Sequence, residues 1–170
     1  MINKKIFNLK NLANKLSSSK KKIGLCHGVF DLLHLGHINH FNEAKNNCDI
    51  LVVSVTEDKH VSKGPGRPVF DQYQRMEALS NLESIDYVVL SNKESAVETI
   101  NKIKPRFYFK GPDYKISSQD MTKKILLERK EVEKNSGKLF ITKSEKYSSS
   151  NLINKQLNIF SQNQETLINK

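Results

Sequence analysis

One stretch decides how this chain folds: Gly28-Val29-Phe30-Asp31-Leu32-Leu33-His34-Leu35-Gly36-His37. It follows a short apolar run at 23–26 and leads into a helical pattern, so it lies where a strand is followed by a helix. Backbone N–H groups and the positive end of the helix dipole point the same way at such a junction, where they can bind the phosphates of a nucleotide. Gly36 lets the backbone approach a ligand with no side chain in between. His34 and His37 add two imidazoles at the same place.

Predicted strands and helices alternate along the rest of the chain. Apolar runs and breaker residues predict strands at 22–27, 49–55, 87–90, 106–109 and 138–142. Helices are expected at 36–46, 71–82, 95–103, 120–135 and 148–160, after a short amphipathic helix that spans Ile6 to Leu16. This alternation predicts an α/β fold, a doubly wound, Rossmann-like, five-stranded parallel sheet with helices on both faces.

The length of 170 residues fits one main domain with its own core. We expect an N-terminal helix and linker at 1–21, the main domain at 22–160, and a polar tail or linker start at 161–170. No apolar run approaches the roughly 20 residues that cross a membrane, so no membrane partner is expected. Cys26 and Cys48 are too few for a disulfide framework, are expected to be buried, and fit a cytoplasmic location.

The formal net charge of +10 favours anionic partners in general. Only four of the basic residues are Arg, and the lysines are spread along the whole chain. A nucleic-acid groove would concentrate its cations and interleave them with aromatic residues. We therefore expect no nucleic-acid partner and look for a phosphorylated small molecule instead.

The stretch from Gly28 to His37 resembles the nucleotide-binding signature of the cytidylyltransferase-like nucleotidyltransferases, and its last four residues match the HxGH motif of that family. Other segments resemble the family's later motifs in the family's order. These segments are Lys63-Gly64 with Arg67-Pro68-Val69, Gln74-Arg75-Met76, Lys110-Gly111-Pro112-Asp113-Tyr114-Lys115 and Ser148-Ser149-Ser150-Asn151-Leu152-Ile153. The Lys110 segment is similar to the KGxDY segment of bacterial heptose-phosphate adenylyltransferases.

The resemblance implies nucleotidyl transfer: a nucleoside triphosphate, with ATP favoured, reacts with a sugar phosphate of the heptose-1-phosphate type to give an NDP-sugar and pyrophosphate. The attacking oxygen belongs to a phosphate that is already anionic, so no general base is required. The enzyme has to align the two ligands and stabilise the spreading negative charge. Mg²⁺ is expected to arrive with the triphosphate, and no protein ligand for it is evident.

The same resemblance assigns the site residues. Catalytic roles fall to His34, His37 and Lys63. Nucleotide binding falls to Gly28, Val29, Phe30, Gly36, Lys110, Gly111, Asp113, Ser148, Ser149 and Ser150. Arg75 and Lys143 are expected to bind the acceptor or a phosphate, while Asp31 is either a helix-capping residue or a carboxylate beside a metal ion.

Two other functions compete with this one. The first is a CTP-dependent glycerol-3-phosphate or other polyol-phosphate cytidylyltransferase, because base selection often uses backbone atoms that a sequence does not reveal. The second is a nucleotide- or RNA-binding module that kept the fold and lost catalysis. Homodimers are common in the family, and a sugar kinase fused to this domain or bound to it is a further expected partner.

Overall fold

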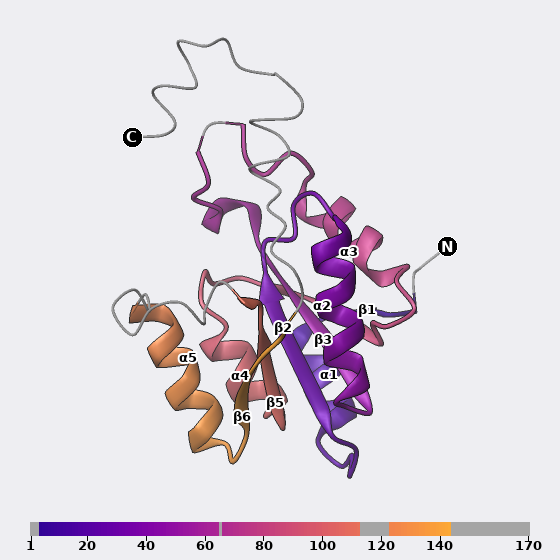
Figure 1. Cartoon of the computed structure of the whole chain (residues 1–170), viewed down its shortest axis with the longest axis vertical. Helices are drawn as coiled ribbons and strands as arrows, with labels where there is room; N and C mark the ends of the chain where they lie inside the picture. The colour runs from indigo at the N-terminus through magenta and orange to yellow at the C-terminus, as the bar shows by residue number, and fades with distance from the viewer. Residues whose placement is uncertain (1–3, 65, 113–122, 144–170) are drawn as a thin grey trace.

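The computed structural model describes residues 4–64, 66–112 and 123–143, and within them the fold is a parallel sheet with helices on both sides (Figure 1). The strands are β1 (Ile6–Phe7), β2 (Ile23–Gly28), β3 (Ile50–Thr56), β4 (Tyr87–Ser91), β5 (Phe107–Lys110) and β6 (Lys138–Ile141). The helices are α1 (Leu9–Leu16), α2 (Leu35–Asn46), α3 (Gln72–Ser80), α4 (Val97–Ile103) and α5 (Lys123–Lys134), with a short 3-10 turn at Asp58–His60. The predicted α/β class and doubly wound parallel sheet are confirmed, and the helix expected at 148–160 lies outside the described residues.

The sheet has six strands among the described residues, one more than the sequence predicted. The additional strand is β1, which pairs with β4 in parallel, with Ile6 beside Val88. Two residues are too few to show the alternation that marks a strand, so Ile6 was wrongly grouped with the apolar face of the following helix. That helix begins only at Leu9, after Asn8, whose side chain accepts a hydrogen bond from the Lys10 backbone N–H at 2.9 Å.

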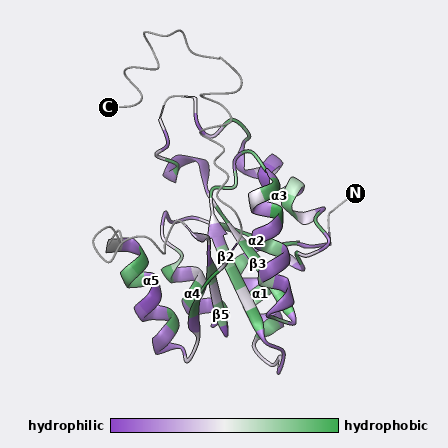
Figure 2. Ribbon diagram, viewed as in Figure 1, coloured by the Kyte–Doolittle hydropathy of each residue, from purple (hydrophilic) through white to green (hydrophobic). Residues whose placement is uncertain are grey.

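Each face of the sheet has its own apolar core. On one face α2 and α3 cover the sheet through Phe41, Met76 and Leu79. On the other face α1, α4 and α5 contribute Leu12, Ile100 and Val132. Figure 2 shows hydrophobic residues along β3, between helices whose outer surfaces are more hydrophilic. This explains why β3 is apolar at nearly every position, since both of its faces are buried.

The order of the strands, β1-β4-β3-β2-β5-β6, reverses direction at β2. In sequence the chain winds outward from β2 through β3 to β4, and then crosses to β5 on the other side of β2. Cys26 of β2 therefore has Val53 as its neighbour on one side and Phe109 on the other. Ligands of such sheets bind beyond the carboxyl ends of the strands at this reversal, where β2 ends at Gly28 and β5 at Lys110.

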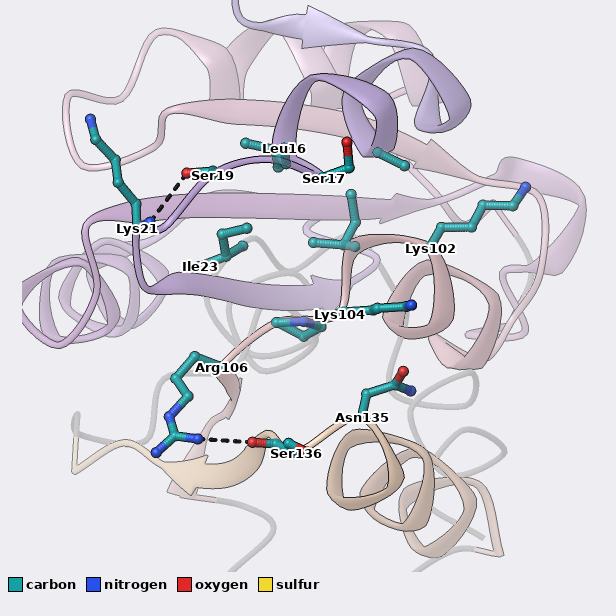
Figure 3. A pocket seen from close by; sticks show the side chains of 13 residues that line it. Leu16, Ser17, Ser19, Lys21, Ile23, Lys102, Lys104, Arg106, Asn135 and Ser136 are labelled. Atoms are coloured by element: carbon teal, nitrogen blue, oxygen red, sulfur yellow. Dashed lines mark hydrogen bonds between the residues drawn. The ribbon is translucent and has the colours of Figure 1, made fainter.

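A cavity of about 440 Å³ lies at the opposite edge of the sheet, where the strands begin (Figure 3). Four cations line it, namely Lys21, Lys102, Lys104 and Arg106. The carboxyl ends of α1, α4 and α5 meet there too, and each presents carbonyl groups with partial negative charge. The cations offset that charge, and Arg106 donates a hydrogen bond to the Ser136 carbonyl at 2.9 Å. This cavity is remote from the turn that contains the paired histidines.

The two cysteines, Cys26 and Cys48, are buried and free, as the sequence predicted. Within the described part of the chain, no helix combines the length and the apolar character needed to cross a membrane.

Candidate active site

The turn after β2 is shaped by Phe30, which has a φ of 51° although it is not a glycine. This left-handed conformation folds the ring back over Gly28, where an added Cβ would lie only 3.0 Å from the ring. The buried ring also contacts the His37 ring edge-on, with 5.5 Å between ring centroids, and Phe41 at 5.2 Å. Gly28 and Phe30 therefore pack together and support the turn from inside, and their contact with nucleotide stays a prediction.

His34 and His37 come together at the start of α2. Their rings stack with 3.8 Å between centroids and an angle of 20° between planes. His34 is the N-cap residue, with extended φ and ψ of −140° and 170°, yet no side chain caps this helix. The His37 N–H already bonds to the His34 carbonyl at 2.9 Å, so Leu35 and Gly36 carry the N–H groups that this helix start can offer to an anion. Gly36 is buried in this first turn.

Both imidazoles are neutral at pH 7. Burial and the nearby Lys63 lower the pKa of His34. Burial, His34, His40 and Lys63 lower the pKa of His37 to about 3, against the opposing effect of a hydrogen bond to the Leu32 backbone. His37 Nδ1 is buried and has no hydrogen-bond partner among the described residues. The negative charge of a triphosphate bound beside the rings would raise the pKa of both.

Lys63 lies close enough to the histidine pair for its charge to lower the pKa of both rings, and Asp31 holds the segment 67–70 that follows. The Asp31 carboxylate accepts hydrogen bonds from the Val69 and Phe70 backbone N–H groups at 2.8 and 3.1 Å, and from Arg67 Nε at 2.6 Å. Asp31 is 3% exposed, and it clamps the loop to the turn after β2 without capping a helix. Arg67 Nη2 is buried with no hydrogen-bond partner among the described residues, so it is a further candidate donor to phosphate.

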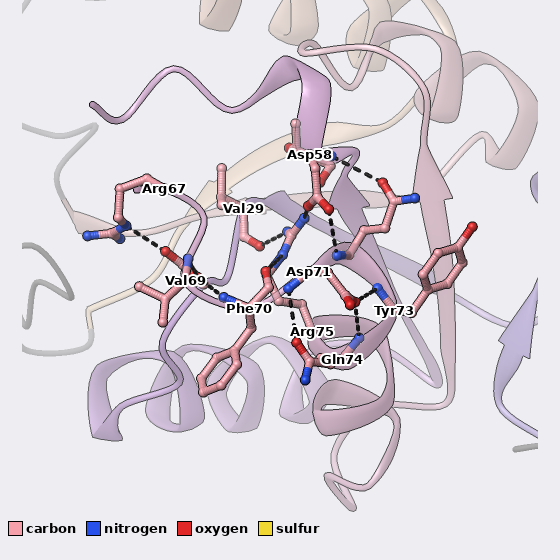
Figure 4. A network of polar contacts seen from close by, with 12 residues as sticks. Val29, Asp58, Arg67, Val69, Phe70, Asp71, Tyr73, Gln74 and Arg75 are labelled. Carbon is pink, nitrogen blue, oxygen red and sulfur yellow. Dashed lines mark hydrogen bonds and ion pairs between the residues drawn. The ribbon is translucent and has the colours of Figure 1, made fainter. Parts of the chain in front are cut away.

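Arg75 lies differently from what the sequence suggested (Figure 4). Its side chain is buried, at 1% exposed, and its guanidinium binds oxygen atoms of the protein itself. It donates to the Phe70 carbonyl at 3.0 Å, the Val29 carbonyl, the Thr56 carbonyl at 2.8 Å and the Asp58 carboxylate at 2.6 Å. Arg75 thus joins the ends of β2 and β3 to the loop before α3, and it supports the turn after β2 from the interior of the protein.

Lys110 is buried at the end of β5, where its ammonium lies 3.3 Å from a carboxylate oxygen of Glu128. Sequence reasoning missed Glu128. The available signal was its place on α5 between Ile125 and Val132, at the spacing of the buried face of the helix. Gly111 follows in open surroundings, since a Cβ added there would meet nothing within 4 Å.

Of the remaining residues that the sequence predicted for the site, Lys143 and Val29 lie in the part of the chain that the structure describes. Lys143 is exposed just beyond β6, and its backbone N–H donates to the Glu43 carboxylate of α2 at 2.8 Å. That contact places Lys143 beside the helix that begins at the histidine pair. Val29 lies in the turn itself and offers its carbonyl to Arg75. Asp113, Ser148, Ser149 and Ser150 lie outside the described residues.

A protein-bound Mg²⁺ does not fit the part of the site that the structure describes. Among the described residues, no group of three or more His, Cys, Asp or Glu side chains could hold a metal ion. Asp31, the one carboxylate in the turn, is already occupied by Arg67 and two backbone amides.

Together these features define a class: a doubly wound α/β domain with paired histidines at a helix start, beside the point where the strand order reverses. Comparison with known proteins gives the family. The chain belongs to the cytidylyltransferase-like family, whose model matches residues 25–155, and it is a nucleotidyltransferase.

Relatives of known name agree with this assignment. The bifunctional protein HldE of Aliarcobacter butzleri (strain RM4018) is 38% identical over 124 residues, which cover 70% of this chain and 26% of that protein. The bifunctional protein HldE of Geobacter metallireducens is 39% identical over 115 residues, or 65% of this chain and 24% of that protein. The chain thus spans about a quarter of the length of these curated relatives.

Solved structures show the same fold. A lipopolysaccharide core biosynthesis protein from Thermoplasma volcanium GSS1 has a TM-score of 0.57 and 29% identity, covering 75% of this chain and 99% of that one. The pantoate-beta-alanine ligase of Francisella tularensis has a TM-score of 0.62 over 96% of this chain and 76% of its own, at 18% identity. The second likeness concerns the fold alone.

Proposed function

We propose that this nucleotidyltransferase joins ATP and a sugar phosphate of the heptose-1-phosphate type, giving an NDP-sugar and pyrophosphate. One observation supports the proposal above all others. His34 and His37 stack at an uncapped helix start, on the edge of the sheet where the strand order reverses. The Lys110-Gly111-Pro112 segment at the end of β5 adds the resemblance to heptose-phosphate adenylyltransferases.

In the proposed reaction, a phosphate oxygen of the acceptor attacks the α-phosphorus of the nucleotide. A new P–O bond forms there, the bond from the α-phosphorus to the β-phosphate oxygen breaks, and pyrophosphate leaves with that electron pair. No side chain has to remove a proton, because the attacking oxygen is already anionic. The described residues hold the phosphates and stabilise charge through the His34 and His37 rings, the N–H groups at the start of α2, and Lys63.

Proposed partners follow from this chemistry. The triphosphate would bring Mg²⁺ with it, which neutralises part of the charge on the leaving pyrophosphate. Because the chain spans about a quarter of its HldE relatives, which are named as bifunctional, a sugar kinase joined to this domain or bound to it belongs to the proposal. A homodimer without nucleic-acid or membrane partners, working in the cytoplasm, completes it. Asp113, Lys143 and the three serines at 148–150 keep their proposed roles in ligand binding.

The cytidylyltransferase alternative makes the same use of the histidines, so substrates have to separate the two. ATP and CTP are each incubated with heptose-1-phosphate or glycerol-3-phosphate and Mg²⁺, and pyrophosphate release is measured. We expect the highest kcat/KM for ATP with the heptose phosphate. A preference for CTP with glycerol-3-phosphate would establish the alternative instead.

His37→Ala tests the catalytic assignment. Removing a preorganised donor to the transferring phosphate should lower kcat about a hundredfold or more. Because the ring also packs against His34 and Phe30, kcat is expressed per mole of folded protein, with the folded fraction measured by urea unfolding. Lys102→Ala is the control, because Lys102 pairs with Glu98 at 2.7 Å and lines the cavity at the opposite edge of the sheet, remote from the histidine pair. Unchanged turnover in His37→Ala would contradict the proposal. If the wild-type protein shows no turnover and His37→Ala binds nucleotide as tightly as the wild type, the non-catalytic binding module is favoured.

A further inference from the structure

A buried carboxylate lies behind the nucleotide edge of the sheet, at a position that none of the motifs includes. Glu128 of α5 is 4% exposed. Its Oε1 accepts hydrogen bonds from the Ala96 backbone N–H at 2.8 Å and the Ser95 hydroxyl at 3.2 Å. Its Oε2 accepts one from the Tyr108 hydroxyl at 2.8 Å and lies 3.3 Å from Lys110 Nζ. One side chain thus joins the start of α4, the end of β5 and α5.

The surroundings keep Glu128 ionised. Burial alone would raise the pKa of its carboxyl, but Lys110, the Ala96 amide and the Tyr108 hydroxyl outweigh that effect, and the pKa is lowered. Lys110 is buried as well, with its ammonium 5.0 Å from the centroid of the Tyr108 ring. A buried ion pair persists when further hydrogen bonds satisfy both partners, and Glu128 meets that requirement with its other donors.

The loop at 92–96, between β4 and α4, is held from a second side as well. His27, near the end of β2, lies 3.1 Å from the Glu94 carbonyl through Nε2 and 3.1 Å from the Ser54 hydroxyl through Nδ1. Burial and Lys110 lower the pKa of His27 to about 4, so the ring is neutral at pH 7. A carbonyl can only accept, so Nε2–H donates to it and Nδ1 accepts from the hydroxyl. Side chains from β2 and α5 therefore fix this loop together.

We propose that Glu128 is a positioning residue for nucleotide binding. Its one carboxylate fixes both Lys110, at the end of β5, and the 92–96 loop. Strand β5 pairs with β2, and the loop contacts His27 near the end of β2, where the strand order reverses. Segments that are already in place lose less conformational freedom when a ligand arrives, so the ligand binds more tightly. The inference rests on the proposed function, since it concerns the nucleotide half of the same site.

Glu128→Gln tests the inference, because it keeps the size of the side chain and removes the counter-ion of Lys110. The KM for ATP, measured with Mg²⁺, should rise about tenfold, while kcat and the KM for the phosphorylated acceptor stay within about twofold. A structural defect would instead reduce the folded fraction, which lowers kcat per mole and leaves both KM values unchanged. Glu133→Gln is the matched control on the exposed face of α5, where Glu133 pairs with Arg129 at 2.8 Å.

Tyr108→Phe is a milder second variant in case Glu128→Gln does not fold. It removes one hydrogen bond to Glu128, and the KM for ATP should rise about threefold with kcat unchanged. The role of Glu128 would be overturned if the variants that fold keep the wild-type KM for ATP, or if both KM values rise equally. Either result would leave the proposed function intact. Wild-type protein that shows neither ATP binding by calorimetry nor pyrophosphate release with any substrate pair would overturn both.

Discussion

Replacing Arg75 distinguishes a buried support from a phosphate-binding side chain. Arg75→Ala removes a guanidinium that binds three backbone carbonyls, one buried and two half-buried, and the carboxylate of Asp58. A buried acceptor left unpaired costs about 1–3 kcal/mol, with the lower end expected where water enters the space left behind. The Asp58 side chain is 37% exposed, so its ion pair adds at most about 1 kcal/mol. The free energy of unfolding should therefore fall by about 3–5 kcal/mol.

The assay is urea unfolding monitored by circular dichroism, with pyrophosphate release measured in parallel. Arg129→Ala is the control, since Arg129 pairs with Glu133 on the surface, where both side chains are about half exposed. That variant should lose less than about 1 kcal/mol. For Arg75→Ala, kcat/KM should fall for both substrates together, because the ends of β2 and β3 move with the loop before α3.

One result would refute this reasoning. If Arg75→Ala unfolds within about 1 kcal/mol of wild type and raises the KM of a single phosphorylated ligand more than about tenfold, the guanidinium contacts that ligand. The role that the motif suggested for Arg75 would then hold, and the buried network would be dispensable.

Two further predictions concern pH and the basic loop. His27 and His40 have pKa values of about 4 in the fold, below the ordinary 6.5, so only the unfolded chain takes up these protons as pH falls below about 6.5. His37 behaves in the same way, because its pKa in the fold is about 3. Together the three histidines should lower the free energy of unfolding by about 6 kcal/mol from pH 7 to about pH 5, and a urea midpoint that does not change would contradict this. Asp31→Asn removes the charge that holds Arg67, so tryptic cleavage after Lys63 should accelerate about tenfold, and an unchanged rate would show that the clamp is unimportant.

The sequence was sufficient for the features that depend on neighbouring residues. Buried parallel strands leave continuous apolar runs, and their alternation with amphipathic helices indicated the doubly wound sheet. The histidines could be located because their motif falls between a strand and a helix. Strand β1 could not be located in the same way, because two residues are too few to show the alternation of a strand. Its pairing partner also lies far along the chain, with Ile6 beside Val88.

Among the site residues, the difference between Arg75 and His37 shows where sequence reasoning ends. His37 lies at the helix start, stacked on His34, with a buried ring nitrogen that no described residue binds. Arg75 also has the chemistry of a phosphate ligand, but its donors bind carbonyls that come from other parts of the chain. Residue type therefore did not reveal that Arg75 is buried in a network of protein contacts while His37 lies at the helix start.

The amino-acid sequence by itself determined the α/β class, the turn with the paired histidines and the family resemblance, because each depends on the order of residues within one segment. Only the tertiary structure decided that Glu128 pairs with Lys110, that Asp31 holds the basic loop and that Arg75 is buried. Those facts depend on distances between segments remote in the chain. Such distances are set by the packing of helices on the sheet, and burial then determines which charged groups must find partners within the protein.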